Sequence, residues 1–99
     1  ATKLIVAGVN AESSLEAADE AREACAAGAD AIMVFLPNAF ALAHTTAMAV
    51  LHHSCIADAV PGVPMFLFQA HHAAGRMGFT PGTMAELLKI KTVVGILVV

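Results

Sequence analysis

The alternation of apolar runs with helix-like segments is the feature that most restricts the fold of this chain. The apolar runs are rich in β-branched residues and comprise Lys3–Gly8, Asp30–Leu36, Val63–Gln69 and Thr92–Val99. Runs of this length and character are typical of buried strands, and strands that alternate with helices form parallel sheets through right-handed crossovers. We therefore predict an α/β fold in one domain over residues 1–99. It is a four-stranded parallel β-α-β-α-β-α-β unit, arranged as half of a (β/α)8 barrel or as a flavodoxin-like open sheet.

Capping signals indicate where the helices begin and end. Each begins with a hydroxyl residue whose oxygen can accept a hydrogen bond from the first helical turn, namely Ser13, Thr45 or Thr46, and Thr80 before Pro81. Gly28 and Pro61-Gly62 are placed to end the first two helices. Helical spacing predicts these core-facing residues: Leu15, Ala18, Arg22, Cys25 and Ala26, then Met48, Leu51, Cys55, Ile56 and Ala59, then Met84, Leu87 and Leu88.

Composition limits the partners and the compartment of the protein. Apolar residues make up 59% of 99 residues, which is more than one small domain can bury. The last run, Thr92–Val99, also leaves a sheet edge, so we expect self-association as a homodimer through open sheet edges. The net charge is −3 and the five basic residues are scattered, which disfavours nucleic acid. No run is long enough to span a membrane and no leader is evident, so we expect a cytoplasmic protein with reduced Cys25 and Cys55.

Three stretches together carry a resemblance to a known family. They are Ile5–Ser14, Ala26–Pro37, and Val63–Phe68 together with Thr92–Ile96. In order and spacing they resemble the central part of the dihydrodipicolinate synthase / N-acetylneuraminate lyase family. The resemblance implies a (β/α)8 barrel of which this chain corresponds to strands three to six. The family's Gly-Thr-Thr-Gly-Glu segment, which helps to bind the pyruvyl carboxylate, has no counterpart here.

Two departures from the family concern its catalytic residues. The resemblance places the imine-forming lysine at Leu97 and the catalytic tyrosine at Phe68, and the sequence has no tyrosine. An alkyl side chain cannot form a Schiff base, so the covalent step lacks its nucleophile. We hypothesise a cut or redesigned structural fragment of a class I aldolase or lyase barrel, without catalytic activity and without a cofactor. The alternative is a lyase or aldolase that acts on a 2-oxo acid such as pyruvate in an assembled barrel.

A pocket or anion site is predicted where strands end. The turn from Gly8 to Ser14 leads into a helix N-terminus, where backbone N–H groups can hold an anion. Neither phosphate-binding glycine motif is present, so an ordinary capped turn is the competing interpretation, and an anion-binding module is a third function. The candidate residues are Gly8, Asn10, Ser13, Ser14, Pro37, Asn38, Phe68 and Gln69.

The histidines and the acidic residues have simpler interpretations. His71 and His72 follow a strand and are weak candidates for metal ligands, but we predict no metal site. His52 and His53 are adjacent on a helix and point about 100° apart, so they cannot readily chelate one ion. We expect these histidines to be solvated or at the core edge, and able to make assembly sensitive to pH. The carboxylates of Glu16, Asp19, Glu20 and Glu23 indicate a solvated helix face.

Overall fold

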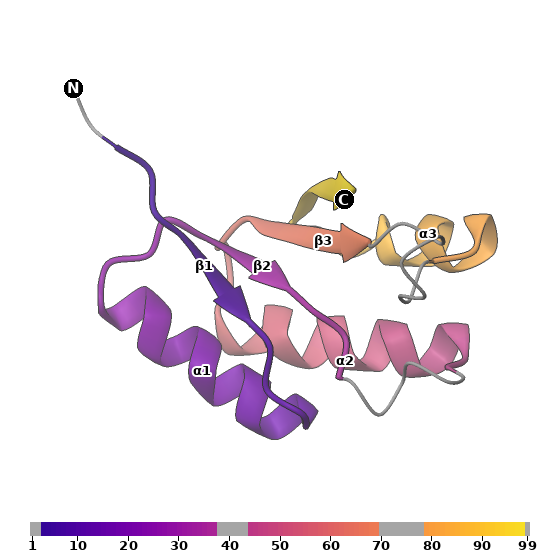
Figure 1. The fold of residues 1–99 in the computed structure, drawn as a ribbon, viewed down its shortest axis with the longest axis horizontal. Coiled ribbons are helices and arrows are strands. Elements are labelled where there is room, and N and C mark those ends of the chain that lie inside the picture. Colours follow the sequence, from indigo (N-terminus) through magenta and orange to yellow (C-terminus); the bar gives the residue numbers. More distant parts are fainter. Residues whose placement is uncertain (1–2, 38–43, 70–78, 99) are drawn as a thin grey trace.

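The computed structural model describes residues 3–37, 44–69 and 79–98 (Figure 1). Within them the strands are β1 (Val6–Val9), β2 (Ala31–Val34), β3 (Met65–Gln69) and β4 (Val93–Val98). The helices are α1 (Ser14–Ala26), α2 (Thr46–Ala59) and α3 (Pro81–Leu87). Strands and helices alternate along the chain, which confirms the predicted α/β fold.

The four strands form one parallel sheet in the order β1-β2-β3-β4. A flavodoxin-like sheet would place the first strand inside the sheet, in the order 2-1-3-4-5. The flavodoxin-like alternative is therefore wrong, and the sequential order is the one found in a (β/α)8 barrel. Helix α1 packs on α2 and α2 packs on α3, and Figure 1 shows α1 and α2 on the same side of the sheet.

An irregularity in register separates β3 from β4. Met65 pairs with Val93, whereas the next residue, Phe66, pairs with Gly95, so Val94 is an extra residue on β4. This two-against-one arrangement is a β-bulge. Beyond the bulge the pairing is regular, and Phe68 lies opposite Leu97.

Helix α1 begins and ends where the sequence predicts. The Ser13 hydroxyl accepts a hydrogen bond from the Glu16 N–H at 3.1 Å, and Gly28 follows the helix with φ of 111°, a conformation that favours glycine. The predicted inward face is wrong at three positions, because Leu15, Arg22 and Ala26 are exposed, Leu15 by 75%. The buried residues are Ala17, Ala18 and Ala21, whose small side chains let α1 approach its neighbours closely.

Helix α2 is capped by Thr45, whose hydroxyl accepts the Met48 N–H, but its buried face differs from the predicted one. Leu51, predicted to face the core, is 69% exposed. The buried residues are Ala49, His52, His53 and Ile56. Because α2 lies between α1 and α3, its smaller and polar residues fill the contacts between helices.

Helix α3 begins at Pro81 after the Thr80 cap, as predicted. Its buried residues are Thr83 and Leu87, whereas Leu88, predicted to face the core, is 56% exposed. The Thr83 hydroxyl lies 2.7 Å from the Thr46 hydroxyl, so a polar contact joins the first turns of α2 and α3.

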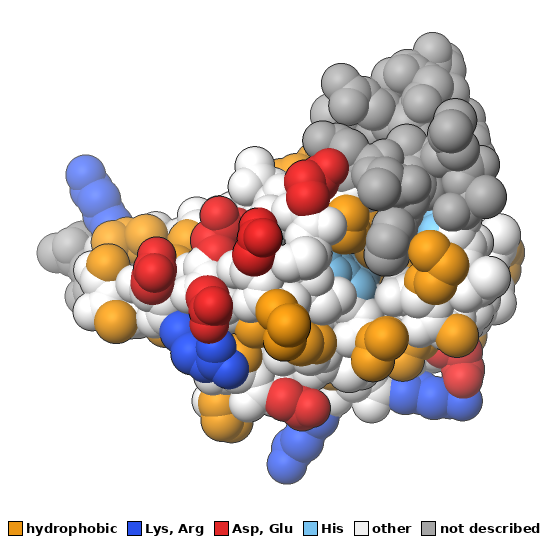
Figure 2. All heavy atoms as spheres, turned by 90° about the horizontal axis from the view of Figure 1, so that it is seen from below, with side chains coloured by type: hydrophobic (Ala, Val, Ile, Leu, Met, Phe, Trp, Pro, Cys, Tyr) orange, Lys and Arg blue, Asp and Glu red, His pale blue; other side chains and the backbone are white. Residues whose placement is uncertain are grey.

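The core lies between the sheet and the helices. It is formed by one face of the strands, chiefly Ile32, Val34, Met65 and Leu67, packed against Ile56 of α2 and Leu87 of α3. Acidic side chains gather on the part of the helix-side surface formed by α1 (Figure 2), and Glu16, Asp19 and Glu23 are exposed there. In the ranges that the structure describes, no helix is both long and apolar enough to cross a membrane.

Candidate functional site

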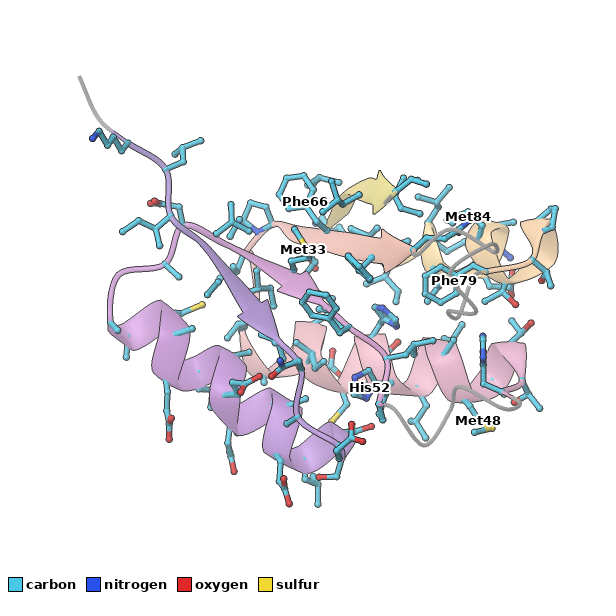
Figure 3. The ribbon with its side chains drawn as sticks, viewed as in Figure 1. Met33, Met48, His52, Phe66, Phe79 and Met84 are labelled. Carbon is cyan, nitrogen blue, oxygen red and sulfur yellow. The ribbon has the colours of Figure 1, made fainter. Side chains whose placement is uncertain are left out.

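The face of the sheet that points away from the helices is the candidate site. Side chains alternate along a strand, so the residues between the core residues point to this other face. We call it the open face and define it by Val6, Gly8, Met33, Phe35, Phe66, Phe68, Gly95 and Leu97. Figure 3 shows Met33 and Phe66 on the side of the sheet opposite α2. In parallel α/β barrels this face is the lumen, and the chemistry occurs at its carboxyl end.

Phenylalanine rings lie on the open face and pack closely against one another and against the neighbouring strands. The rings of Phe35 and Phe68 pack with centroids 4.5 Å apart and planes inclined by 43°. A Cβ atom added to Gly8 would lie 3.2 Å from the Phe35 ring, and one added to Gly95 would lie 3.2 Å from the Phe66 ring. Because Gly8 and Gly95 lack a side chain, the rings of Phe35 and Phe66 can lie against their backbones.

The carboxyl end of the open face has no chemically reactive side chain among its described residues. Phe68 and Leu97 are register partners on adjacent strands, so they lie side by side there. Leu97 is 42% exposed and ends the row of apolar groups. This pair can exclude water, but it can neither attack a carbonyl group nor transfer a proton.

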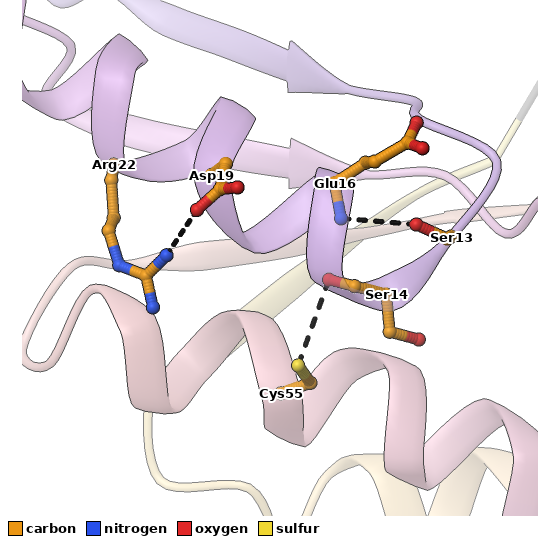
Figure 4. A network of polar contacts seen from close by, with 6 residues as sticks. All are labelled: Ser13, Ser14, Glu16, Asp19, Arg22 and Cys55. Atoms are coloured by element: carbon orange, nitrogen blue, oxygen red, sulfur yellow. Dashed lines mark hydrogen bonds and ion pairs between the residues drawn. The ribbon is translucent and has the colours of Figure 1, made fainter.

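The predicted turn from Gly8 to Ser14 is held by internal hydrogen bonds. The Asn10 N–H donates to the Glu20 carboxylate at 2.6 Å, and the Ser13 hydroxyl caps Glu16 (Figure 4). An external anion at Asn10 would have to displace the Glu20 carboxylate, which already provides the negative charge. The geometry therefore agrees with an ordinary capped turn.

Ser14 joins a hydrogen-bonded series through His52 to the end of β2. The Ser14 hydroxyl lies 2.9 Å from His52 Nδ1, and His52 Nε2 lies 3.2 Å from the Phe35 carbonyl oxygen. A carbonyl oxygen can only accept, so Nε2 carries the proton and Ser14 donates to Nδ1 in the neutral ring. Burial lowers the pKa of His52, and the bond to Phe35 opposes this shift. The expectation of a solvated or core-edge histidine is wrong here, because His52 is 1% exposed.

His53 is also buried, but only one of its two ring nitrogens has a hydrogen-bond partner in the described ranges. Its Nδ1 donates to the Ala49 carbonyl at 2.7 Å, whereas its buried Nε2 has no hydrogen-bond partner in the described ranges. Burial lowers the pKa of His53 to about 4; the bond to Ala49 opposes the shift and His52 adds to it. Its ring lies edge-on to Phe79, with centroids 6.0 Å apart. No group of three or more metal-ligand side chains occurs in residues 3–37, 44–69 and 79–98.

The other predicted site residues are not gathered at one point. Pro37 is fully buried. The Gln69 side-chain oxygen accepts a hydrogen bond from the Phe79 N–H at 3.3 Å, and alternation puts Gln69 on the opposite face from Phe68. Asn38, His71 and His72 lie outside the described residues.

Sequence reasoning missed the contribution of Phe35, Phe66 and Met33 to the open face. The signal was present, because Met33 and Phe35 alternate with the core residues Ile32 and Val34. The sequence-based prediction treated β2 as buried on both faces, so this alternation was not used. A separate open hollow of about 360 Å³ lies at the opposite, amino end of the sheet, lined by Ala57, Asp58, Pro61, Gly62, Ile90, Lys91 and Thr92.

Comparison with known proteins gives one family and a consistent set of folds. The model of the Dihydrodipicolinate synthetase family matches residues 3–97. No curated protein matches the sequence. Among solved structures, the Ruminococcus gnavus sialic acid aldolase is similar with a TM-score of 0.83 and 22% identity. That alignment covers 96% of this chain and 31% of the aldolase.

Two further structures are similar over the same part of the chain. One is described as the catalytic lysine mutant of the same aldolase, with a TM-score of 0.81, 22% identity, and coverage of 94% and 30% of the two chains. The other is N-acetylneuraminate lyase from Fusobacterium nucleatum complexed with pyruvate, with a TM-score of 0.78, 13% identity, and coverage of 96% and 30%. This chain therefore spans less than a third of the length of the proteins that it resembles.

Proposed function

Since the chain belongs to the dihydrodipicolinate synthetase family, we propose that it is a structural unit of an aldolase-type (β/α)8 barrel that performs no Schiff-base chemistry of its own. The unit comprises the four consecutive strands and the three helices described above. Its role is to form part of a barrel wall and lumen. One observation carries this proposal, namely the apolar pair Phe68 and Leu97 on the open face.

The pair matters because of its place in the sheet. Both residues lie near the carboxyl ends of their strands, where barrel enzymes hold their reacting groups. The family resemblance assigns the lysine to position 97 and the tyrosine to position 68. The register places these two positions opposite each other, as a nucleophile and its proton-transfer partner would need to be. Both side chains are hydrocarbon here, so neither can supply the reactive group that the resemblance assigns to its position.

Reductive trapping tests the proposal directly. In a class I aldolase the lysine amine adds to the keto carbon of pyruvate, water leaves, and borohydride reduces the imine to a stable amine. We expect no stoichiometric adduct when this chain is treated with pyruvate and borohydride and analysed by mass spectrometry. The Ruminococcus gnavus aldolase and its catalytic lysine mutant serve as positive and negative controls. A one-to-one adduct on the chain would overturn the proposal.

A lyase that acts on a 2-oxo acid in an assembled barrel is the second candidate function. It is favoured by the convergence of Phe35, Phe68 and Leu97 at the catalytic end of the open face. This function requires a lysine from another polypeptide segment, since no described residue of the open face is a lysine. An adduct that forms only after a separate lysine-bearing barrel segment is added, and that maps to that segment, would support it.

The compartment and the origin of the chain are parts of the same proposal. We place the protein in the cytoplasm because Cys25 and Cys55 are both free thiols. The hydrocarbon residues at positions 68 and 97 also agree with a cut or redesigned barrel fragment. Discovery of a natural gene that encodes this frame unaltered would refute the redesign.

A further inference from the structure

A serine and a histidine that the proposed function does not use are hydrogen-bonded to each other between α1 and α2. The Ser14 hydroxyl lies 2.9 Å from His52 Nδ1, and the Phe35 carbonyl oxygen accepts from Nε2 at 3.2 Å. Because Nε2 carries the proton, the lone pair of Nδ1 faces the hydroxyl. A hydroxyl that donates to the basic nitrogen of a neutral imidazole is the arrangement by which histidine activates a serine nucleophile.

The surroundings of His52 keep its ring neutral and fixed in orientation. The residue is 1% exposed, and burial lowers its pKa below 6.5, so the imidazole is an uncharged base at neutral pH. The bond to the Phe35 carbonyl selects the tautomer that presents Nδ1 to Ser14. The same carbonyl oxygen stabilises the imidazolium that forms when Nδ1 takes the serine proton, because Nε2 remains a donor. A carboxylate performs this function in the Ser-His-Asp hydrolases.

Ser14 is the member of the pair that a reagent can reach, since it is partly exposed. It is the first residue of α1 and follows the turn that leaves β1. Strand, turn, serine and helix occur in the same order in the nucleophile elbow of α/β-hydrolases, where the N–H of the next residue donates to the oxyanion. The glycines of that motif do not flank Ser14. The Leu15 N–H nevertheless belongs to the first helical turn, whose N–H groups have no acceptor within the helix.

We propose that Ser14 is a nucleophile activated by His52 and that it takes the acyl group of an uncharged ester. The Ser14 Oγ forms a bond to the carbonyl carbon while its proton passes to Nδ1. The ester C–O bond then breaks, and the departing alkoxide takes the proton from Nδ1. A water molecule, deprotonated by the same nitrogen, releases the carboxylic acid and restores the serine. Nothing is oxidised or reduced, and no residue of the open face takes part.

The residues beside Ser14 determine the class of ester. Glu12 and Glu16 are exposed on either side of it in the sequence, and their carboxylates repel an anionic ester. Leu15 is 75% exposed, so it offers an apolar contact next to the nucleophile. The expected substrates are therefore short esters without charge, of which p-nitrophenyl acetate is a convenient example.

Labelling with an alkyl fluorophosphonate is the first test. This reagent bonds to an activated serine through phosphorus with loss of fluoride, and the adduct is stable enough to be located by digestion and mass spectrometry. The unaltered chain contains its own controls, because Ser13 and Ser54 are serines outside the pair. A general base contributes about 10²–10⁴-fold, so Ser14 should be labelled at least about 100-fold faster than Ser13. No label at Ser14, or equal labelling of all three serines, would overturn the proposal.

The pH dependence of this labelling tests the role of His52. With a neutral imidazole as the base, the rate should fall as the pH drops through the pKa of His52, below 6.5, and should be level above it. A serine without a histidine would instead react in proportion to the hydroxide concentration. Far-UV circular dichroism at each pH confirms that the chain is folded. A rate that rises without a plateau up to pH 9 would overturn the assignment to His52.

A matched pair of variants tests the nucleophile. Ser14→Ala should abolish the adduct and slow the hydrolysis of p-nitrophenyl acetate by at least about tenfold. Ser54→Ala removes a partly exposed serine from α2, and both activities should persist. Unchanged hydrolysis by a folded Ser14→Ala would overturn the proposal; if that variant does not fold, the labelling and its pH dependence in the unaltered chain decide. Pyruvate trapping detects a lysine adduct, so the two proposals can fail separately.

Discussion

Acid should destabilise this protein through His53. The ring is fully buried, and its pKa falls from 6.5 in the unfolded chain to about 4 in the folded one. The unfolded state therefore binds a proton more readily than the folded state, and the free energy of unfolding decreases as the pH falls from about 6.5 towards 4. The difference of about 2.5 between the two pKa values corresponds to about 3 kcal/mol by pH 4. His52, whose pKa burial also lowers, acts in the same direction.

Chemical denaturation at a series of pH values measures this effect. The chain has no tryptophan and no tyrosine, so far-UV circular dichroism is the appropriate signal. The protein concentration is held constant because any association between chains would contribute to stability. We expect a loss of about 3 kcal/mol or more between pH 7 and pH 4, which is a large fraction of the total for a small domain.

Two variants distinguish the contribution of His53 to acid sensitivity from the contributions of other groups. His53→Leu removes the titrating ring and its unpartnered Nε2, so the loss between pH 7 and pH 4 should shrink by about 3 kcal/mol. Ile56→Val, on the same helix and equally buried, should lower stability by about 1 kcal/mol at every pH and leave the slope unchanged. If His53→Leu is as acid-sensitive as the original chain, the assignment to His53 is wrong.

Two further predictions concern helix ends. Gly28→Ala should cost about 1–2 kcal/mol because φ is 111° there, whereas Gly82→Ala should stabilise by about 0.5–1 kcal/mol, since Gly82 lies in α3 with no atom near its added Cβ. Opposite signs of the change in thermal midpoint are the expected outcome, and equal signs would contradict it. Thr45→Ala should cost about 1 kcal/mol by removing the cap of α2, and Thr45→Ser should restore most of it. Denaturant midpoints measure both, and an unchanged Thr45→Ala midpoint would contradict the role of the cap.

The order of elements and their ends could be predicted from the sequence because they depend on local signals. Ser13, Thr80 and Gly28 act within one turn of their own helix, and the structure confirms each of them. The helix faces could not be predicted in the same way. Helix α2 is apolar on several sides, so its contacts with α1 and α3 decide that His53 is buried and Leu51 is exposed.

The candidate site, like the fold, could be predicted from the sequence only in part. The family resemblance singled out positions 68 and 97, and the register places them opposite each other. The contribution of Phe35 was not predicted, because β2 was read as buried on both faces and its alternation with Ile32 and Val34 was not applied. The opposite placement of Gln69 follows from the alternation of side chains, which the sequence-based assignment of pocket residues did not apply.

The extra residue Val94 decides which face of the sheet each later residue of β4 points to. Val93 packs in the core, and in a regular strand Gly95 and Leu97 would point into the core with it. The bulge reverses that assignment, and so position 97 lies on the open face. Deletion of Val94 would exchange the two faces of the strand and send a lysine introduced at position 97 to the helix side. The face on which a side chain at position 97 lies therefore depends on Val94, three residues before it.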